Sequence, residues 1–439
     1  MPAITVLPKN DATNGWSRIL PDRTPQPRLD KDVRADWAVV GAGFAGLAAA
    51  RRLAQNRPGE SIVLLEAHEA GENASGRNSG FAIDLPHNVG SALEELDGSR
   101  RYMALSRAAI EHLDEQVKSH RIACNWSRRG KYHTAVSARG AREVLEPFSQ
   151  ELDKLGEPWR WLSKDVLARE IGTAYHHAAV YTPGCVLMNP AALVRGLAGS
   201  LPGNVTLHEH SPVIQVAYDD GVRLTTPHGS VTAPRMMLCV NGLAEQFGFF
   251  QGKLLRFAAH ASLTRPLTAN ERGALGGVDD WGVTPANAFV SSTMRFTQDH
   301  RILIRHGIAY DPAHRIGTGQ HERIRRRHVT EFRRRFPMLP DVTFEYTWTG
   351  YVCLSQNHAP GFGRVAPNVW AAVCQNAVGV TKGTIGGLLA ADMATGVDNP
   401  LIKDMESLGT PTDLPMRPIL DFGVHARTRL DLWWRRYER

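Results

Sequence analysis

Three glycines and one glutamate near the start of the chain have the residue types and spacing of a phosphate-binding turn. Gly41, Gly43 and Gly46 form a G-x-G-x-x-G pattern, and Glu66 follows the last of them after about 20 residues. The first glycine makes a tight turn, the second lets a pyrophosphate touch the backbone, and the third allows a helix to pack closely on a strand. The helix N-terminus offers unpaired N–H groups to the phosphates, and the acid accepts hydrogen bonds from a ribose. The pattern therefore predicts a dinucleotide-binding site.

The segments around this pattern supply the elements that would position it. Residues 37–40 and 61–65 are short apolar runs typical of buried strands, and residues 47–53 form an Ala-rich helical segment between them. A glycine triplet by itself is weak evidence, because an ordinary glycine turn has the same residues. The strand, the helix, the second strand and the acid together make the dinucleotide interpretation specific.

A second strand–turn–helix unit lies near the other end of the chain. Residues 370–374 form a buried strand, and a glycine-containing turn then leads into an apolar helix. The two units, at 39–49 and 373–391, are separated by about 300 residues, so the chain between them is expected to form a second domain and return.

Length and composition favour a globular protein with two domains. A chain of 439 residues is too long for one small core, and its 43% hydrophobic and 22% charged residues are ordinary values. The 51 basic and 44 acidic residues are weak evidence for any partner. Five cysteines without a C-x-x-C pair argue against a disulfide framework, and no metal site is predicted. The N-terminus lacks a signal-peptide pattern and no run has transmembrane length, so a cytoplasmic location is expected.

Five stretches of sequence carry a more specific signal. They are GAGFAG with Glu66, ASGRNSGF at Ala74–Phe81, MLCVNGLAEQF at Met237–Phe247, TWTGYVCLSQNHAPGFG at Thr347–Gly363 and NAVGVTKGTIGGLLAADM at Asn376–Met393. In these stretches the chain resembles the D-amino-acid oxidase superfamily of FAD-dependent amine oxidoreductases, which includes glycine and sarcosine oxidases. The S-G-R-N loop and the W-x-G…N-x-A-P-x-F-G stretch look closest to its γ-glutamylputrescine oxidase and L-pipecolate oxidase branches.

The resemblance implies an α/β fold with two domains. A discontinuous Rossmann-like domain would bind FAD, and a second α+β domain with a mostly antiparallel sheet would bind the substrate. The expected boundaries are residues 1–32 for an N-terminal arm, 33–90, 186–248 and 345–405 for the FAD-binding domain, 91–185 and 249–344 for the substrate domain, and 406–439 for a C-terminal tail or helix.

The resemblance also assigns cofactor contacts residue by residue. The glycine turn would hold the pyrophosphate, Glu66 the ribose and Val213 the adenine, and the loop at 75–79 would pass the pyrophosphate and the flavin. The helix that starts at Gly379 would bring its N-terminus and Lys382 to the N1–C2=O edge of the flavin, where N–H dipoles and a cation stabilise negative charge. The full predicted set is Gly41, Gly43, Phe44, Ala45, Gly46, Glu66, Ala67, Ser75, Arg77, Asn78, Ser79, Val213, Asn241, Gly242, Cys353, Gly379, Val380, Lys382, Gly383 and Thr384.

Three of these assignments keep a structural alternative. Arg77 could instead be a loop arginine that pairs with a backbone carbonyl, and Lys382 could be a solvated lysine near a turn. Cys353, preceded by Val352, matches the pair that carries FAD covalently in the monomeric sarcosine oxidases. A small buried cysteine is also common in protein cores, so covalent attachment through Cys353 is one of two open interpretations.

Four residues are predicted to act on the substrate. The resemblance implies a carboxylate-bearing substrate, which a bidentate guanidinium suits, and Arg295 on an expected strand is the lead candidate beside Lys382. A surface arginine is the alternative for Arg295. Tyr351 could line the pocket and His260 could face the flavin, although a chain with 18 histidines has many structural ones.

The resemblance implies an FAD-dependent amine or amino-acid oxidase or dehydrogenase. The C–N bond of a γ-glutamyl-polyamine, pipecolate or another secondary amine would be oxidised by hydride transfer to flavin N5, and the imine would hydrolyse in water. Oxygen and a membrane quinone both stay open as electron acceptors. A flavin monooxygenase is disfavoured because its Gly-Asp signature is absent, and a nicotinamide dehydrogenase would not need the second glycine turn. A non-catalytic flavoprotein subunit is the remaining alternative.

Two basic stretches are interpreted without nucleic acid, because no aromatic–basic RNA signature is visible. The arginines at 323–335 follow one helix with apolar residues on its other side, so a solvated basic face is expected. Near the C-terminus, the arginines at 427–439 are mixed with Trp433, Trp434 and Tyr437. A helix docked on the protein's own surface is the preferred interpretation there, and peripheral contact with the inner face of an anionic membrane is the alternative.

Overall fold

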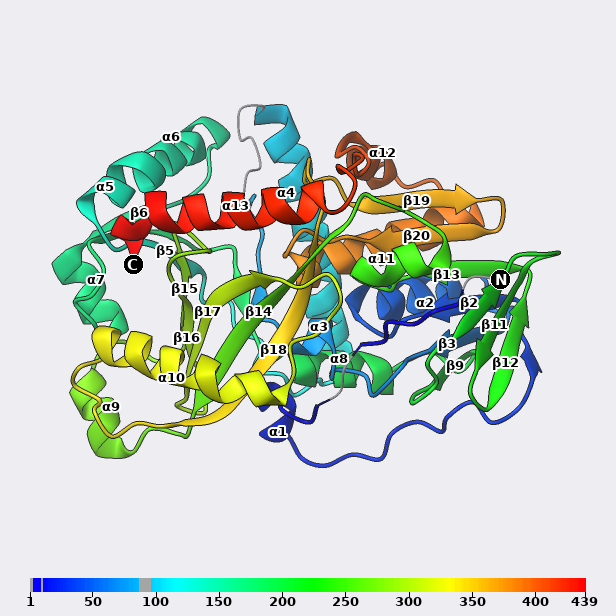
Figure 1. The fold of residues 1–439 in the computed structure, drawn as a ribbon, viewed down its shortest axis with the longest axis horizontal. Helices are drawn as coiled ribbons and strands as arrows, with labels where there is room; N and C mark the ends of the chain where they lie inside the picture. Colours follow the sequence, from blue (N-terminus) through cyan, green and yellow to red (C-terminus); the bar gives the residue numbers. More distant parts are fainter. Residues whose placement is uncertain (1–2, 9–10, 87–95) are drawn as a thin grey trace.

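The computed structural model describes residues 3–8, 11–86 and 96–439, and these form two parts that lie side by side (Figure 1). A mostly parallel sheet with its helices forms one part, the parallel-sheet half, and a larger, mostly antiparallel sheet forms the other, the large-sheet half. Strands from both ends of the chain pair in the parallel-sheet half, as the separated glycine turns predict. The α/β fold class expected from the sequence is confirmed.

Six strands form the main sheet of the parallel-sheet half, in the order β19-β20-β13-β2-β3-β9. Neighbouring strands are parallel except β19 and β20, which are antiparallel. The strands are β2 (Trp37–Val40), β3 (Ile62–Leu65), β9 (Val205–His208), β13 (Arg235–Leu238), β19 (Gly361–Ala366) and β20 (Val369–Val373). β2 and β3 are buried along their whole length because both faces of the sheet are covered.

The alternation of side chains along β2 shows what covers each face. Trp37 and Val39 pack against helices, while Ala38 and Val40 pack against a smaller sheet. The helices are α2 (Phe44–Asn56), α4 (Leu96–Ser119), α8 (Pro190–Gly199), α11 (Gly379–Thr395) and α12 (Leu401–Ser407). The smaller sheet has the order β1-β12-β11-β10 and consists of β1 (Val33–Arg34), β10 (Gln215–Ala217), β11 (Val222–Thr226) and β12 (Gly229–Ala233).

Eight strands form the sheet of the large-sheet half, in the order β18-β14-β17-β16-β15-β5-β7-β6. Neighbours are antiparallel except β15 and β5. The strands are β5 (Lys131–Ala135), β6 (Arg160–Ser163), β7 (Ala178–Thr182), β14 (Leu255–Thr264), β15 (Trp281–Pro285), β16 (Thr293–Phe296), β17 (Ile302–Tyr310) and β18 (Phe344–Leu354). Its helices are α5 (Ala138–Gly140), η1 (Ala141–Leu145), α6 (Glu146–Leu155), α7 (Lys164–Ile171), α9 (Ala269–Leu275) and α10 (Thr318–Arg335).

Short elements join the two halves, and the N-terminal arm is docked across them. These elements are α1 (Gly15–Arg18), α3 (Ala74–Arg77), β4 (Phe81–Ala82), β8 (Val186–Leu187) and η2 (Asn241–Phe247). Trp16 Nε1 in α1 donates to Asn78 O at 2.8 Å, and Trp348 Nε1 in β18 donates to Arg77 O at 3.0 Å. The loop predicted to pass the cofactor is therefore held by two buried indoles from distant parts of the chain.

The observed elements differ from the predicted ones in a few places. The alternation of residues around Gly130 predicts a strand pair at 126–136, but the structure has the single strand β5 there. β18 pairs with β14 in the large sheet, although residues 345–354 are assigned from sequence to the FAD-binding domain. The helix predicted from residue 91 is observed from Leu96, and residues 91–95 lie outside the described part of the chain.

The C-terminal segment contains α13 (Ile419–Trp434) and η3 (Arg436–Glu438). α13 lies along the outside of the large-sheet half (red in Figure 1), and none of its residues is buried. No helix within residues 3–8, 11–86 and 96–439 is long and apolar enough to cross a membrane.

Candidate functional site

Two adjoining cavities lie between the carboxyl ends of the parallel strands and the large sheet. The first has about 1270 Å³ of empty volume and the second about 1130 Å³. Ala74, Arg77, Tyr351 and Val352 line both, so the two cavities share a wall. Ligands of open α/β sheets bind at this edge.

The first glycine turn forms one wall of the first cavity. Gly41 has a φ of 97°, and a Cβ there would lie 2.8 Å from the carbonyl oxygen of Cys239. A Cβ at Gly46 would overlap the carbonyl oxygen of Gly41, so glycine at 46 lets α2 start directly behind the turn. Gly43 is the N-cap of α2 and provides no side-chain cap, which leaves the positive end of the helix dipole for phosphate oxygens.

Glu66 at the end of β3 forms the floor of the same cavity. Its Oε2 accepts a hydrogen bond from Ala42 N at 2.8 Å, and its Oε1 accepts from His68 N at 3.2 Å and from Asn73 Nδ2 at 3.1 Å. Burial raises the pKa of Glu66 in spite of these donors. A buried carboxyl group at this place suits the hydroxyl groups of a ribose, as the sequence predicts.

The N-terminal arm closes the first cavity. The lining residues from the arm are Ile4, Val6, Leu7, Pro8 and Asp11. Asp11 Oδ1 accepts a hydrogen bond from Arg77 Nη2 at 2.8 Å. Burial opposes ionisation of Asp11, but the hydrogen bond and the charge of Arg77 outweigh it and lower the pKa of Asp11. The sequence predicts an arm but no part in the cavity, because the arm carries no recognisable motif.

Arg77 lines both cavities, but its guanidinium forms hydrogen bonds with other residues of the protein. Besides Asp11, it donates from Nε to Glu72 O at 2.6 Å and from Nη1 to Thr349 O at 3.0 Å. Arg77 thus ties α3 to β18 and to the arm through its guanidinium, and its contact with a cofactor stays a prediction.

The second glycine turn forms a wall of the second cavity, with Ala377, Val378, Gly379 and Val380 in the lining. Val378 is the N-cap of α11 and makes no side-chain hydrogen bond to the helix. Cys374, Asn376 and Ala377 have positive φ values of 55°, 49° and 63° in the preceding turn. The N-terminus of α11 is therefore presented to the cavity, where its dipole would stabilise negative charge on a bound ring.

Lys382 does not line either cavity. Its Nζ lies 4.7 Å from the centroid of the Tyr102 ring, and burial lowers its pKa to about 8. The neighbouring residues serve packing, since a Cβ at Gly383 would contact the Cβ of Phe44 at 3.5 Å, and Thr384 Oγ1 donates to Val380 O at 2.6 Å. The predicted contact of Lys382 with the cofactor is therefore not part of the cavity lining.

Arg305 on β17 lines the second cavity, and the sequence analysis does not single it out. Its guanidinium donates to Ala288 O at 2.7 Å and to Thr293 Oγ1 at 2.6 Å. Burial lowers its pKa to about 10, and no carboxylate within residues 3–8, 11–86 and 96–439 forms an ion pair with it. Arg305 is thus a half-buried cation that borders a cavity without a counter-charge from the described protein.

The predicted substrate arginine, Arg295, lies elsewhere. Its Nη1 donates to Gly80 O at 3.0 Å and to Met188 O at 2.5 Å, and its Nη2 lies 3.5 Å from Asp280 Oδ1. It lines neither cavity and holds the segments around β4 and β8. The register of β16 and β17 places the two arginines at different levels of the sheet. Arg305 pairs with Thr293 of β16, whereas Arg295 pairs with Leu303 of β17. The signal for Arg305 is a charge inside the apolar run of residues 302–308, but the run alone does not show which arginine reaches the cavity.

Of the other two residues predicted to act on the substrate, Tyr351 lies at the cavities and His260 does not. Tyr351 lines both cavities, and its hydroxyl donates to Asp311 Oδ2 at 2.6 Å while its ring stacks on His314 with centroids 3.8 Å apart. His260 is outside both linings, with its Nδ1 3.0 Å from Thr349 Oγ1. Burial, with the nearby charges of other basic groups, lowers the pKa of His260 to about 3, so it is neutral at physiological pH.

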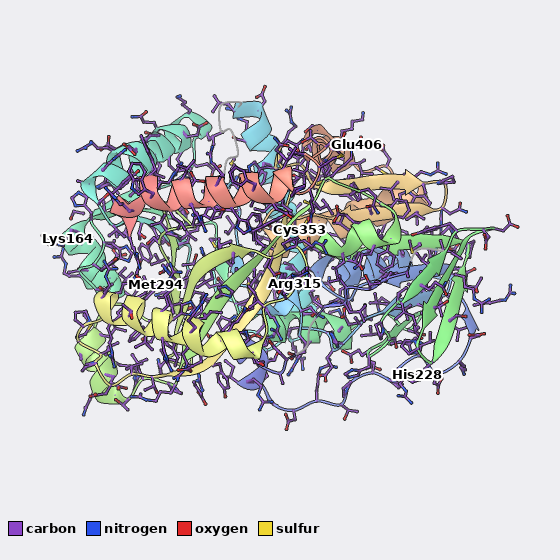
Figure 2. The ribbon with its side chains drawn as sticks, viewed as in Figure 1. Lys164, His228, Met294, Arg315, Cys353 and Glu406 are labelled. Carbon is purple, nitrogen blue, oxygen red and sulfur yellow. The ribbon has the colours of Figure 1, made fainter. Side chains whose placement is uncertain are left out.

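Cys353 lines the first cavity and lies near the middle of the molecule (Figure 2). It is not part of the lining of the second cavity, where α11 begins. A hydrogen bond with Cys374, together with burial, raises the pKa of Cys353 well above that of a free thiol. The thiolate form that attacks other groups is therefore suppressed.

The other predicted cofactor residues divide by location. The first cavity is also lined by Ala67, Ser75, Val213, Asn241 and Gly242, and the second by Asn78 and Ser79. Phe44 and Ala45 form the first turn of α2, behind the glycine wall. Within the described residues, no group of three or more His, Cys, Asp or Glu side chains could hold a metal ion.

Comparisons with known proteins agree with this geometry. Residues 36–393 match the DAO family model, described as FAD dependent oxidoreductase. The chain is 24% identical over 400 residues to the gamma-glutamylputrescine oxidoreductase of Escherichia coli, covering 90% of each chain, and 24% identical over 408 residues to the probable oxidoreductase OrdL of Haemophilus influenzae, covering 91% of each. A glycine oxidase from Geobacillus kaustophilus has a similar fold, with a TM-score of 0.68 at 19% identity over 84% of this chain and 96% of that one.

Proposed function

The chain belongs to the DAO family of FAD-dependent oxidoreductases that act on amines and amino acids, and we propose that its own substrate is an amine bearing a carboxylate. FAD is the cofactor. The residues that would hold it are the first glycine turn and Glu66 for the dinucleotide part and the N-terminus of α11 for the ring. These residues fit FAD because both glycine turns border adjoining cavities.

One observation carries the proposal for the substrate. Arg305 is a half-buried guanidinium that borders the second cavity and has no ion-pair partner among the residues that the structure describes. Removing water from an unpaired cation is costly, and a substrate carboxylate would offset that cost with bidentate, charge-assisted hydrogen bonds. Ala288 and Thr293 hold the guanidinium in place, so it is preorganised for such a ligand.

The other residues of the second cavity position the substrate rather than exchange protons with it. Phe81, Phe289 and Ile308 give the cavity apolar walls that exclude water. No Asp, Glu, His, Lys or Cys is found among the described residues that line it. FAD, when bound, supplies the acceptor for the hydrogen and the electrons that leave the carbon next to the amine nitrogen. The substrate amine must therefore arrive neutral, and its own pKa would set the rising limb of the pH–rate profile.

The substrate class can be narrowed by comparison with relatives. The Escherichia coli relative is named for γ-glutamylputrescine, which carries a carboxylate at one end and an amine at the other. We infer that a γ-glutamyl-polyamine, pipecolate or another carboxylate-bearing secondary amine fits the second cavity, because Arg305 would hold the carboxylate while the apolar walls enclose the remaining chain. The use of oxygen or a membrane quinone as electron acceptor and a cytoplasmic location stay predictions.

Anaerobic flavin reduction tests this function. The purified yellow enzyme is mixed with matched pairs, namely pipecolate and piperidine, γ-glutamylputrescine and putrescine, and sarcosine and dimethylamine. We expect bleaching at 450 nm by at least one carboxylate-bearing member and at least a tenfold slower bleaching by its partner without the carboxylate, which is a difference of about 1.4 kcal/mol. Equal rates within every pair would contradict the carboxylate requirement. Absence of bleaching by all six would contradict C–N oxidation of these amines.

A further inference from the structure

The outward face of α13 is apolar, which is unusual for a helix on a protein surface. Seven of the twelve large apolar side chains exposed in the described residues lie between residues 416 and 434. Phe422, Leu430, Trp433 and Trp434 are 77%, 61%, 57% and 63% exposed, whereas those outside this segment do not exceed 40%. A group of large apolar side chains at such exposure marks an interaction surface rather than scattered surface residues.

The spacing of most of these residues places them on one face of the helix, whereas Leu432 falls on the other side. Ile419, Phe422, Leu430 and Trp433 follow one another at intervals of three or eight residues, which places them on the same side of a helix. Trp434 lies at the edge of this apolar stripe. At 100° per residue, Arg427 and Arg429 fall about 80° to either side of the centre of this stripe. The outward face is thus an apolar stripe with a cation along each border, and we call it the α13 stripe.

The opposite face of α13 fixes the helix to the protein. Tyr310 donates its hydroxyl to Asp421 Oδ1 at 2.9 Å, and its ring meets His425 edge-on. Beyond the helix, Glu438 accepts a hydrogen bond from Val136 N at 2.9 Å, and Tyr437 donates to Glu143 Oε2 at 2.6 Å. The preferred expectation that α13 covers the protein's own surface is therefore only partly right, because the helix docks through polar contacts and turns its apolar side outward.

We propose that the α13 stripe binds the surface of an anionic lipid bilayer. Tryptophan, phenylalanine and leucine flanked by arginine are the composition of helices that lie in the membrane interface, with the apolar face among the acyl chains and the cations at the phosphate groups. Trp433 and Trp434, next to Arg435 and Arg436, concentrate this character at the end of the helix. The docked helix is preformed, so no ordering of the chain opposes binding.

The charges of α13 disfavour a second copy of the chain as the occupant. Its two carboxylates are already engaged, Asp421 with Tyr310 and Asp431 with Arg427. Two α13 stripes packed face to face about a two-fold axis would bring arginine borders together without acidic partners on the stripe. An anionic headgroup layer suits the apolar stripe and the Arg429 border, which has no ion-pair partner among the described residues, while Arg427 is already paired with Asp431.

Vesicle binding by the full-length, FAD-loaded enzyme tests the proposal. The protein is mixed with phosphatidylcholine vesicles that contain either no anionic lipid or phosphatidylglycerol, and bound protein is separated by flotation. We expect binding to the anionic vesicles that is at least about tenfold stronger than to the neutral ones and that weakens with salt. No binding to anionic vesicles, or equal binding to both, would overturn the proposal.

Substitutions on the stripe identify the surface that binds. Phe422→Asp combined with Leu430→Asp should abolish vesicle binding, and Arg429→Gln combined with Arg436→Gln should weaken it by at least about tenfold. Trp161→Asp is the matched control, since Trp161 on β6 is 38% exposed and lies outside α13. The altered side chains are exposed, so flavin content and thermal unfolding should match the wild type. Retained binding in the double aspartate variant would refute the assignment to α13.

Sedimentation equilibrium without lipid tests the alternative that the α13 stripe binds a second copy of the chain. We expect the wild type and the double aspartate variant to have the same mass. A concentration-dependent dimer that the aspartate substitutions dissolve, without vesicle binding, would show instead that the stripe joins two copies. The readouts are partition and mass, so they do not depend on whether the enzyme oxidises the proposed amines.

Discussion

The two walls of the site are built in different ways. In the parallel-sheet half, backbone groups at two helix N-termini and glycines that allow close approach form the wall. In the large-sheet half, single side chains such as Arg305 on β17 and Tyr351 on β18 do so from two strands that flank β14. The backbone wall depends on residues that are neighbours in sequence, whereas the side-chain wall depends on which residues the strand register places at the same level. The first wall should tolerate no added atoms, and the second should respond mainly to changes in charge.

Gly46→Ala should have the largest effect, because the added Cβ would overlap the carbonyl oxygen of Gly41 and push α2 away from the turn. We expect the purified variant to retain less than about a tenth of the normal flavin, as the helix N-terminus would no longer meet the pyrophosphate. The ratio of absorbance at 450 nm to that at 280 nm measures this loss.

Gly59→Ala provides the matched control for this change. A Cβ at Gly59 would have no atom within 4 Å, so the same substitution should leave the flavin content unchanged. If Gly46→Ala keeps its flavin, the backbone wall does not form the cofactor site in the way proposed.

Arg305→Met should have the next largest effect, and on the opposite wall. We expect kcat/KM for a carboxylate-bearing amine to fall about 100-fold or more, because removing one partner of a buried charge pair costs roughly 2–5 kcal/mol. Flavin content should stay normal, since Arg305 does not line the first cavity. Steady-state kinetics with an amine that lacks the carboxylate should show little change.

Arg295→Lys is the comparison that shows whether register decides function. Arg295 bonds to Gly80, Met188 and Asp280, so the shorter and less branched cation should lower the thermal stability while leaving KM near the wild-type value. A large rise in KM with unchanged stability would place the substrate carboxylate at Arg295 and refute the assignment to Arg305.

Acid should weaken the large-sheet half before the parallel-sheet half. Burial lowers the pKa of His176 and His260 to about 3, of His306 to about 2 and of His328 to about 4. Below about pH 6.5 these histidines gain protons in the unfolded chain but not in the folded one, so stability falls as pH falls, by roughly 1.4 kcal/mol per histidine and pH unit. In the parallel-sheet half, burial lowers the pKa of His112 to about 4 as well, whereas Glu66 has the opposite sign, because its raised pKa lets the folded state take up a proton first.

Hydrogen exchange at pH 7 and pH 5 can locate this acid weakening. We expect protection to be lost first in peptides from β14, β17 and α10, and last in those from β2 and β3. His176→Leu gives a direct control, since neither of its ring nitrogens has a hydrogen-bond partner in the described structure. This variant should show a pH dependence of unfolding that is shallower by about 1.4 kcal/mol per pH unit. An unchanged slope would contradict the role assigned to the buried histidines.

The same contrast between the walls explains what could be predicted from sequence. The glycine spacing and Glu66 fix a local geometry, and the structure places them together at the first cavity. The second turn at Gly379 is also recognisable, because a buried strand precedes it and an apolar helix follows. These predictions rest on neighbours in sequence, and the match of residues 36–393 to the family confirms the cofactor.

The side-chain wall could not be predicted from sequence in the same detail. Arg295 and Arg305 lie on adjacent strands with similar apolar surroundings, and the pairing of Thr293 with Arg305 that separates them is a long-range property. The direction of Lys382 toward Tyr102 depends on a helix from another part of the chain. The docked N-terminal arm and the outward face of α13 likewise depend on tertiary contacts, which spacing and composition do not encode.

Cys353→Ser should have the smallest effect, and it sharpens the comparison at the point where the walls meet. Cys353 lines the first cavity from β18, its hydrogen bond with Cys374 and its burial raise its pKa, and the N-terminus of α11 borders the other cavity. A thiol that stays protonated is a poor nucleophile, so we expect FAD to be bound without a covalent bond. The variant should then change flavin content by less than about twofold, since serine keeps the size and a hydrogen-bonding group at this position. The wild-type band on a denaturing gel should show no flavin fluorescence. A fluorescent band that disappears in Cys353→Ser would show instead that the Cys353 side chain holds the cofactor covalently, in addition to the backbone wall.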